Sequence, residues 1–333
     1  MFLLTIDSVF TNNLSNDGKV AMRLVKRWQG IKLGLVVGLA CSLLLGACGT
    51  TKQTSSTTVT RTDYLKHKVK VPKHPKRVIG SYLEDDLVAL GIKPVVQWSV
   101  KNGSGTQEYL KKSLKGVPLI DYSLPYEAVT KAKPDLILMG TSSAVANGKY
   151  AQYSKIAPTY VVKNGTNVTW RQTFLDVAKA VNRQAKAKKV LAKYDQKVAT
   201  TRKALKKSGQ HKVAVLWVTN NTAYMVNDSS ASGALLYGDL KLGEPSLVKQ
   251  VSKSATADWS AVSLEKLAKL DADDIFLVNS QKGAALFKDP LWKNIKAVKN
   301  KHLYQYGDSS SWQYSGPIAY SQMIDMVKKD LLK

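Results

Sequence analysis

Apolar residues follow an alternating pattern in two separate regions of the chain. Between residues 77 and 162, short apolar runs such as RVIG, LILM and TYVV alternate with amphipathic segments. The short runs predict buried strands and the amphipathic segments predict helices, which together favour a mainly parallel sheet covered by helices. The same alternation returns between residues 212 and 307, and an amphipathic segment over 316–332 predicts a last helix. The pattern therefore predicts two α/β lobes.

A single long helix is predicted between the two regions, over residues 184–208. Ala187, Leu191 and Leu205 belong to an apolar stripe with spacings of three and four, while lysines occupy the other faces. Gly209 follows, a residue type at which helices commonly end. At 1.5 Å per residue the helix is about 37 Å long, enough to lie against two domains. An ordinary surface helix of one domain would show the same stripe, but the lobes on both sides favour a connector.

We expect an α/β fold with two Rossmann-like lobes joined by this long connecting helix. The expected boundaries are an N-terminal lobe over 65–168, connecting helices over 169–209 and a C-terminal lobe over 210–333. Because a continuous helix bends little, ligand binding should move the lobes only slightly.

The N-terminal segment has the layout of a secretory signal. An apolar run follows several basic residues and ends in small residues, and the segment MRLVKRWQG makes Met22 a typical alternative start. The run closes with Leu45-Gly46-Ala47-Cys48, which resembles the bacterial lipobox, whose cysteine carries lipid. A retained membrane-spanning anchor with an incidental cysteine is the alternative. We expect residues 1–47 to be a signal peptide, Cys48 to be lipidated, and the polar residues 48–64 to form a flexible tether.

The chain is strongly basic, with a formal net charge of +26. Removal of residues 1–47 takes away five basic and two acidic residues and leaves +23. The lysines are scattered without a basic and aromatic recognition motif, which argues against a nucleic-acid partner for an exported protein. An anionic ligand or cell-envelope polymer fits the charge better. Cys41 leaves with the signal and Cys48 is the lipid site, so disulfides, thiolate zinc sites and cysteine nucleophiles are excluded from the folded body.

One local pattern occurs once in each predicted lobe. EAVTKAKPD begins at Glu127 and EKLAKLDAD begins at Glu265, and in both the glutamate is followed by lysine after four residues and by aspartate after eight. A Glu–Lys pair at this spacing supports a helix. An apolar run follows each aspartate, and a helix that leads into a buried strand would place each glutamate at its exposed start.

Three segments resemble the substrate-binding proteins of ABC importers for ferric siderophores, haem and cobalamin. They are PKRVIGSYLEDDLVALGIKPV, YEAVTKAKPDLILMG and VSLEKLAKLDADDIFLV, and the resemblance, which includes the long helix, covers residues 65–333. It implies a ligand held between two rigid lobes and delivered to an ABC permease driven by a cytoplasmic ATPase. It also implies that Glu127 and Glu265 dock on the permease, although the helix dipole alone would favour glutamates in these first turns.

The ligand site is expected beyond the carboxyl ends of the strands, where open α/β folds bind their ligands. The polar and aromatic residues that follow the predicted strands are Ser81, Tyr82, Trp98, Lys101, Tyr122, Ser142, Trp217, Trp259, Trp312 and Tyr314. Any one of the tryptophans could instead pack in a core, as we expect for Trp170 and Trp292. Four tryptophans at strand ends nevertheless favour a shared aromatic site. Such rings suit a bulky chelate around a metal, and Lys101 would assist an anionic one.

Metal-ion and catalytic sites find less support. None of the four histidines falls at a predicted strand end, which disfavours a site for bare zinc or manganese. Haem would need an axial ligand such as Tyr122, Tyr224 or Tyr314. The sequence contains no phosphate-binding Gly-Lys-Ser/Thr loop and no nucleophile elbow, so an anchored serine hydrolase is a remote alternative.

We expect an exported, lipid-anchored monomer on the outer face of the cell membrane that catalyses no reaction and needs no cofactor. Its expected ligand is a ferric siderophore, with haem or cobalamin as the alternatives that the resemblance leaves open. The predicted site is rich in aromatic residues and poor in arginine, which favours a hydroxamate over a catecholate siderophore.

Overall fold

The computed structural model describes residues 56–100, 105–165, 167–209 and 211–332. The predicted signal peptide, Cys48 and Lys101 lie outside these residues. Thr54–Lys333 form one compact unit, so the predicted boundaries between lobes stay predictions. We use "first lobe" for the described residues up to 180 and "second lobe" for those from 211 onward. Within the described ranges, no helix is both long and apolar enough to cross a membrane.

Three short parallel strands form the centre of the first lobe. They are β3 (Val78–Ser81), β6 (Leu136–Met139) and β7 (Thr159–Val161), and nearly all of their residues are buried, as is usual for parallel strands. A further parallel pair consists of β4 (Gln97–Ser99) and β5 (Leu119–Asp121). The helical segments are α1 (Glu84–Ala89), η2 (Glu108–Leu110), α2 (Tyr126–Lys131), η3 (Ser143–Val145), α3 (Lys149–Ile156) and α4 (Trp170–Ala180).

The predicted flexible tether is wrong for its last residues, which are folded. β1 (Thr58–Thr62) pairs with β2 (Lys68–Pro72) in an antiparallel hairpin. The high Ser and Thr content suggested a flexible segment, but β-branched residues also favour a strand. The end of β1 is fastened at two places. Arg61 Nη2 donates to Oδ1 of Asn182, which follows α4, at 2.7 Å, and the Tyr160 hydroxyl of the first lobe donates to the carbonyl of Thr62 at 3.2 Å.

The second lobe contains a five-stranded mixed sheet in the order β10-β9-β8-β11-β12. β8 (Val213–Thr219), β11 (Asp274–Asn279) and β12 (Leu303–Tyr306) are parallel. β9 (Thr222–Val226) pairs antiparallel with β8 on one side and with β10 (Trp259–Val262) on the other. The prediction of a mainly parallel sheet is wrong for this edge. Asn220 and Asn221 both have positive φ, 48° and 54°, and form the two-residue turn that reverses the chain between β8 and β9.

The remaining helical segments belong to the second lobe and the connection to it. Around the five-stranded sheet lie α6 (Ala231–Gly233), the π-helical η4 (Ala234–Asp239), α7 (Ser246–Lys253), α8 (Leu264–Leu267), η5 (Ala285–Lys288), α9 (Pro290–Lys293), α10 (Lys296–Lys299), η6 (Ser311–Gln313) and α11 (Pro317–Leu331). The connection is α5 (Gln184–Ser208), which has the predicted ends.

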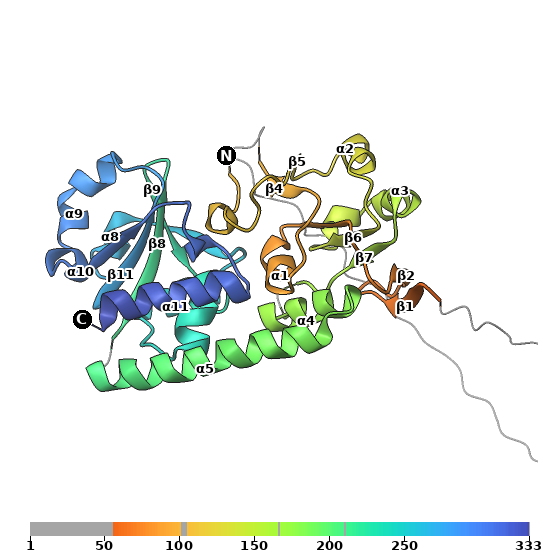
Figure 1. Ribbon diagram of the computed structural model, residues 1–333. Helices are drawn as coiled ribbons and strands as arrows, with labels where there is room; N and C mark the ends of the chain where they lie inside the picture. Colours follow the sequence, from red (N-terminus) through yellow and green to blue (C-terminus); the bar gives the residue numbers. More distant parts are fainter. Residues whose placement is uncertain (1–55, 101–104, 166, 210, 333) are drawn as a thin grey trace, which may run out of the picture. The chain divides into compact units, whose positions relative to one another are not determined.

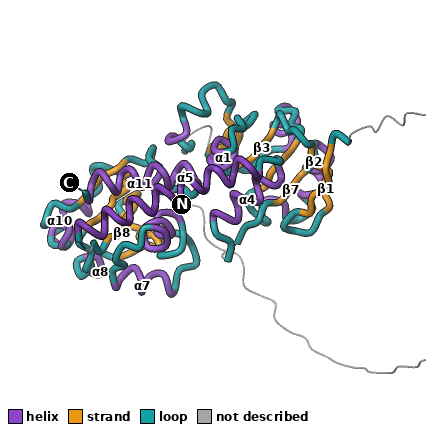
Figure 2. Tube along the Cα trace, turned by 60° about the horizontal axis from the view of Figure 1, so that its bottom comes forward, coloured by secondary structure: helices purple, strands orange, loops and turns teal. Residues whose placement is uncertain are grey.

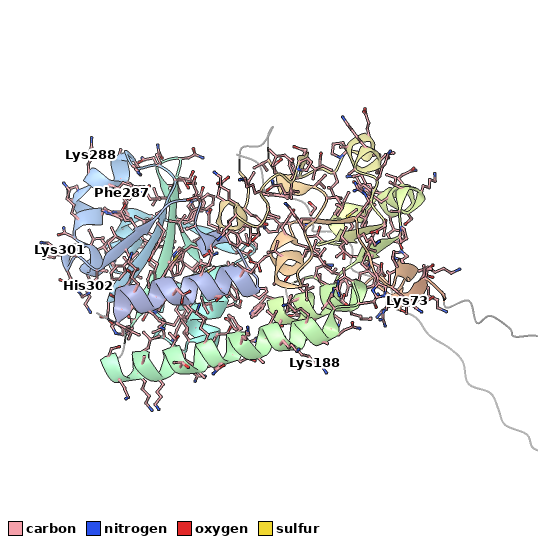
Figure 3. The ribbon with its side chains drawn as sticks, in the orientation of Figure 1. Lys73, Lys188, Phe287, Lys288, Lys301 and His302 are labelled. Carbon is pink, nitrogen blue, oxygen red and sulfur yellow. The ribbon has the colours of Figure 1, made fainter. Side chains whose placement is uncertain are left out.

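The apolar stripe of α5 packs against both lobes. Ala187, near its start, belongs to the core of the first lobe, whereas Tyr194, Val198 and Leu205 belong to a core of the second lobe. α5 runs past both lobes in Figure 1, and α11 lies beside it in both views (Figure 2). Lys188 projects from the exposed side of α5 (Figure 3). A single helix with one buried stripe therefore contributes to two cores, as the pattern predicted.

The repeated Glu-Lys-Asp pattern has the same structural role in each lobe. The carboxylate of Asp135 accepts the N–H of Lys76 at 2.7 Å, and that of Asp273 accepts the N–H of Lys212 at 2.9 Å. In return, Asp135 N donates to the carbonyl of Arg77 at 2.9 Å, and Asp273 N donates to the carbonyl of Lys212 at 2.7 Å. Each aspartate thus fastens the start of one parallel strand to the start of its neighbour.

Candidate functional site

Three predicted ligand residues from both lobes lie together, and we call Tyr82, Trp98 and Tyr314 the junction group. The rings of Tyr82 and Trp98 meet edge-on with centroids 4.9 Å apart, and the centroids of Tyr82 and Tyr314 are 6.0 Å apart. Tyr82 is nevertheless 50% exposed. The junction group therefore presents aromatic surface, from both lobes at once, that a ligand can contact.

The ends of the first-lobe strands place two of these rings. Tyr82 directly follows Ser81, the last residue of β3, and its φ of 61° turns the chain into α1. Trp98 lies in β4, where its backbone N–H donates to Oε1 of Glu84 at 2.7 Å. Both rings thus depend on backbone geometry at the carboxyl edge of the strands, where the sequence pattern predicted the site.

The third ring comes from the second lobe. Tyr314 follows η6, and its hydroxyl donates to the carbonyl of Thr106 in the first lobe at 3.2 Å. Burial raises the pKa of Tyr314 to about 12, with a smaller contribution from the charge of Asp308. The hydroxyl therefore stays protonated near neutral pH and can act as a hydrogen-bond donor.

Glu84 supports the junction group from inside the first lobe. Its side chain is 1% exposed, and Oε2 has no hydrogen-bond partner, whereas Oε1 holds the N–H of Trp98. Burial raises the pKa of this carboxyl to about 8, because the charged form loses its hydration. Glu84 therefore carries a proton for a substantial part of the time near neutral pH.

A second aromatic group lies within the second lobe, and we call Trp217, Tyr224 and Trp259 the sheet group. Trp217 of β8 stands opposite Tyr224 of β9 in the antiparallel register, with centroids 5.4 Å apart, and meets Trp259 of β10 edge-on at 6.1 Å. The indole N–H of Trp217 donates to Oγ of Ser280 at 3.0 Å. All three rings are half-buried. Among the described residues, no ring contact joins this group to the junction group.

Trp312 is not a surface residue, so the expectation that it lines the ligand site is wrong for this structure. Its side chain is 0% exposed and stacks on Phe276 with centroids 4.6 Å apart. The short helix η6 turns the ring inward onto β11 and β12, where Tyr306 also contacts it. Trp312 therefore packs in the core, which was the alternative considered for each of the four tryptophans.

The other predicted ligand residues do not join either aromatic group. Tyr122 is exposed, and its backbone N–H donates to the carbonyl of Ser99 at 2.9 Å. The hydroxyl of Ser142 donates to Oδ1 of Asn164 at 3.2 Å. Ser81 is half-buried at the end of β3, next to Tyr82. Trp170 and Trp292 pack against the cores, as predicted.

Both predicted docking glutamates are exposed in the first turn of a short helix. Glu127 is in the first turn of α2 and Glu265 in that of α8. A hydrogen bond from the hydroxyl of Ser263 lowers the pKa of Glu265, which keeps this carboxylate ionised. Each lobe therefore presents one glutamate to the solvent at an equivalent place of the repeat.

Within the described part of the chain, no three His, Cys, Asp or Glu side chains gather as a ligand set for a metal ion. The two histidines of the second lobe contact residues at the start of β11. His211 Nδ1 lies 2.9 Å from Oδ2 of the buried Asp274, to which the Tyr304 hydroxyl also donates, and His302 precedes β12 at the end of the sheet shown in Figure 3.

The sequence analysis missed three neighbouring acids that support the site. Glu84, Asp85 and Asp86 open α1, where exposed acidic residues are the usual finding, but all three are buried. The available signal was three acids in a row inside a segment that is otherwise apolar, which is an unusual pattern for a solvated helix end.

A model of the periplasmic binding protein family matches residues 81–309. The chain belongs to this family. The periplasmic binding protein described here is 30% identical over 276 residues to the iron(3+)-hydroxamate-binding protein FhuD of Bacillus subtilis, a match that covers 80% of this chain and 84% of that protein. It is 28% identical over 324 residues to the probable siderophore-binding lipoprotein YfiY of the same organism, covering 90% and 97%.

Two further matches extend this result. The chain is 30% identical over 276 residues to the Fe(3+)-citrate-binding protein YfmC of B. subtilis, covering 80% of this chain and 82% of that protein. Among solved structures, it matches a periplasmic binding protein component of a ferrichrome ABC transporter from B. subtilis with a TM-score of 0.69 and 26% identity, over 82% of this chain and 100% of that one. The predicted fold class and family are therefore confirmed.

Proposed function

We propose that this protein is the extracytoplasmic substrate-binding component of an ABC importer and that it captures a ferric siderophore of the hydroxamate type. The observation that carries the proposal is the junction group, in which aromatic side chains from both lobes form one partly exposed surface. Tyr82 lies just beyond the carboxyl end of β3, where α/β folds bind ligands, and Trp98 lies within β4. The match to an iron(3+)-hydroxamate-binding protein supports the ligand class.

The distribution of arginine supports a hydroxamate over a strongly anionic chelate. Arg61 binds Asn182, Arg77 binds the carbonyls of Ala132 and Lys133, and Arg171 pairs with Asp195. These three guanidinium groups are engaged away from the aromatic groups, so they do not offer the bidentate contact that a carboxylate-rich or catecholate complex favours. A neutral chelate with an apolar surface fits tyrosine and tryptophan rings better.

We further propose that lipid on Cys48 anchors the protein to the outer face of the membrane, and that the bound form docks on a permease with a cytoplasmic ATPase. The equivalent exposed positions of Glu127 and Glu265 support the docking role. The similarity to a siderophore-binding lipoprotein supports the anchor. In this role the protein acts as a monomer without a cofactor of its own, catalyses no reaction and binds no nucleic acid.

Replacing Cys48 by serine should release the protein from the membrane fraction or block its maturation.

Ligand titrations test the proposal most directly. Tryptophan emission is followed while ferric hydroxamates, ferric catecholates, ferric citrate, haem and cobalamin are added in turn. We expect saturable quenching at the lowest concentration with a ferric hydroxamate. Tight binding of haem, with no response to any ferric siderophore, would contradict the ligand class. Hydrolysis of an ester that is lost on one Ser→Ala change would point to the hydrolase instead.

A tyrosine substitution tests the site itself. Tyr82→Ala removes the most exposed ring of the junction group and should weaken ferric hydroxamate binding roughly tenfold, since a stacked aromatic contact and its buried area are worth about 1–2 kcal/mol. Tyr64→Ala is the matched control, because Tyr64 is an exposed tyrosine in the turn after β1. Equal affinities for the two variants would reject the junction group as the site.

A further inference from the structure

A buried carboxylate joins the two lobes next to the junction group. Asp85 in α1 of the first lobe accepts the N–H of Ile318 through Oδ1 at 2.9 Å and the N–H of Ala319 through Oδ2 at 2.8 Å. These are free N–H groups in the first turn of α11, in the second lobe, so Asp85 caps that 15-residue helix from outside. The side chain of Asp85 is 3% exposed, and the Tyr109 hydroxyl donates to Oδ2 at 2.9 Å.

A glycine in the second lobe leaves the space that this carboxylate occupies. Gly316, the residue before α11, has φ 139°, and a Cβ added there would lie 2.5 Å from both Cγ and Oδ1 of Asp85. Any side chain at this position would therefore displace the carboxylate or strain the backbone. An aspartate in one lobe and a glycine in the other thus depend on each other, although they are more than 200 residues apart in sequence.

Other contacts between the same two segments are weaker. The Tyr314 hydroxyl donates to the Thr106 carbonyl at 3.2 Å, and Gln322 Nε2 donates to the Tyr109 carbonyl at 3.4 Å. Ile318 also packs against a small apolar cluster made by Leu110, Leu114 and Val117. Figure 1 shows the start of α11 facing α1. Of these hydrogen bonds between the two segments, those to Asp85 are the shortest.

The position of Asp85 couples it to the aromatic surface. In the first lobe it lies three residues after Tyr82, and in the second lobe its partner helix begins three residues after Tyr314. A shift of α11 relative to α1 would change the distance between these two rings. We propose that Asp85 is a positioning residue that holds the two halves of the junction group in the arrangement that binds ligand, so that the site is formed before the ligand arrives.

The distance between the lobes tests this proposal without any ligand. The full chain with Cys41→Ser and Cys48→Ser has no remaining cysteine, so spin labels can be attached at Lys131→Cys in the first lobe and Lys269→Cys in the second, both exposed positions. Double electron–electron resonance then gives the distribution of distances between the lobes. We expect one narrow distribution in the parent and a broader or shifted one in Asp85→Ala.

Asp176→Ala is the matched control. Asp176 is also a buried aspartate, 6% exposed, and its carboxylate accepts the N–H of Lys163 and the hydroxyl of Tyr160, each at 2.9 Å. All of these groups belong to the first lobe. Asp176→Ala should therefore lower stability while the distance between the lobes stays that of the parent. An unchanged distribution in folded Asp85→Ala would overturn the proposal.

Two further variants keep the proposal testable if Asp85→Ala does not fold. Gly316→Ala keeps Asp85 but pushes its carboxylate away and should broaden the distribution as well. Tyr109→Phe removes only one hydrogen bond to Asp85 and should do so to a smaller degree. If Asp85→Ala and Gly316→Ala fail to fold, a parent-like distribution in Tyr109→Phe would itself overturn the proposal.

The ligand measurement rests on the proposed function and is kept separate. If Asp85→Ala leaves the binding arrangement populated about one tenth of the time, the Kd for a ferric hydroxamate should rise about tenfold, whereas Asp176→Ala should leave it within twofold. A parent protein that binds no ferric hydroxamate would reject the proposed ligand but leave the distance result unaffected.

Discussion

The first turns of α1 and α8 place the same residue type in opposite surroundings. Glu84 in α1 is buried, and burial raises the pKa of its carboxyl to about 8. Glu265 in α8 is exposed, and the hydroxyl of Ser263 lowers the pKa of its carboxyl. The helix dipole favours a glutamate at both positions. The difference shows that the surroundings, and not the helix position, decide whether such a glutamate is buried in the fold or carries its charge exposed to the solvent.

The largest expected effect comes from reversing both exposed glutamates. Glu127→Lys with Glu265→Lys should lower ligand uptake by cells at least tenfold, because like charges placed against a complementary partner cost several kcal/mol. The Kd for the ligand should stay within twofold, since neither residue belongs to an aromatic group. Uptake of radioactive ferric ligand and fluorescence titration give the two values.

The control for this reversal carries the same change in net charge elsewhere. Asp195→Lys with Asp325→Lys alters exposed residues of α5 and α11, whose ion pairs with Arg171 and Lys197 contribute little to stability. Uptake by this variant should match the parent. If both double variants transport alike, the glutamates have no docking role.

A medium effect is expected at the buried glutamate, and it depends on pH. Burial raises the pKa of Glu84 to about 8 and that of Asp85 to about 6, so between pH 5 and pH 8 the folded protein binds more protons at these groups than the unfolded chain does. Their contribution to stability is therefore present at low pH and is lost as the pH rises through these values.

Glu84→Gln isolates one part of this dependence. The amide cannot ionise but can still accept the N–H of Trp98, so at pH 8 the variant should exceed the parent in free energy of unfolding by about 1 kcal/mol or more, since one pKa unit corresponds to about 1.4 kcal/mol. At pH 5 the advantage should be much smaller, because this pH is close to the ordinary pKa of a glutamate, where ionisation stabilises the unfolded chain only slightly. Urea unfolding at both pH values measures it, and a difference that does not change with pH would contradict the buried ionisable state.

The smallest effect is expected at Ser263. Ser263→Ala removes the hydroxyl that lowers the pKa of Glu265, but the carboxylate stays exposed and ionised at neutral pH. Uptake at pH 7 should remain within twofold of the parent, and only acidification should separate the two proteins. A large loss at pH 7 would mean that the charge of Glu265 is not what the partner recognises.

Much of the architecture could be predicted because it depends on local patterns. The ends of α5 follow from one apolar stripe and a terminal glycine, and the equivalent places of Glu127 and Glu265 follow from two segments with the same spacing. These features are encoded within about 25 residues each. The position of Tyr82 beyond β3 also follows from the rule that parallel strands present their carboxyl ends at one edge, whereas Trp98 lies within β4.

Features that depend on distant residues could not be predicted in the same way. Whether Trp312 faces solvent or Phe276 depends on how η6 is oriented against a strand more than 30 residues earlier. The burial of Asp85 depends on free N–H groups in α11, which no local pattern around α1 reveals. The β8–β9 reversal had a local signal, since Asn220 and Asn221 favour a tight turn, but the apolar runs around it also suited parallel strands.

The hairpin at the start of the described chain has a mechanical consequence. A pull on an anchor at Cys48 would enter the fold at Thr58, the first residue of β1, whose five residues all pair with β2. The far end of β1 is held by Arg61 and by the hydrogen bond from Tyr160 to Thr62. Tension would therefore be taken up first by the hydrogen bonds of this hairpin and by these two contacts. The hairpin is thus the first folded element of the described chain that such a load would reach.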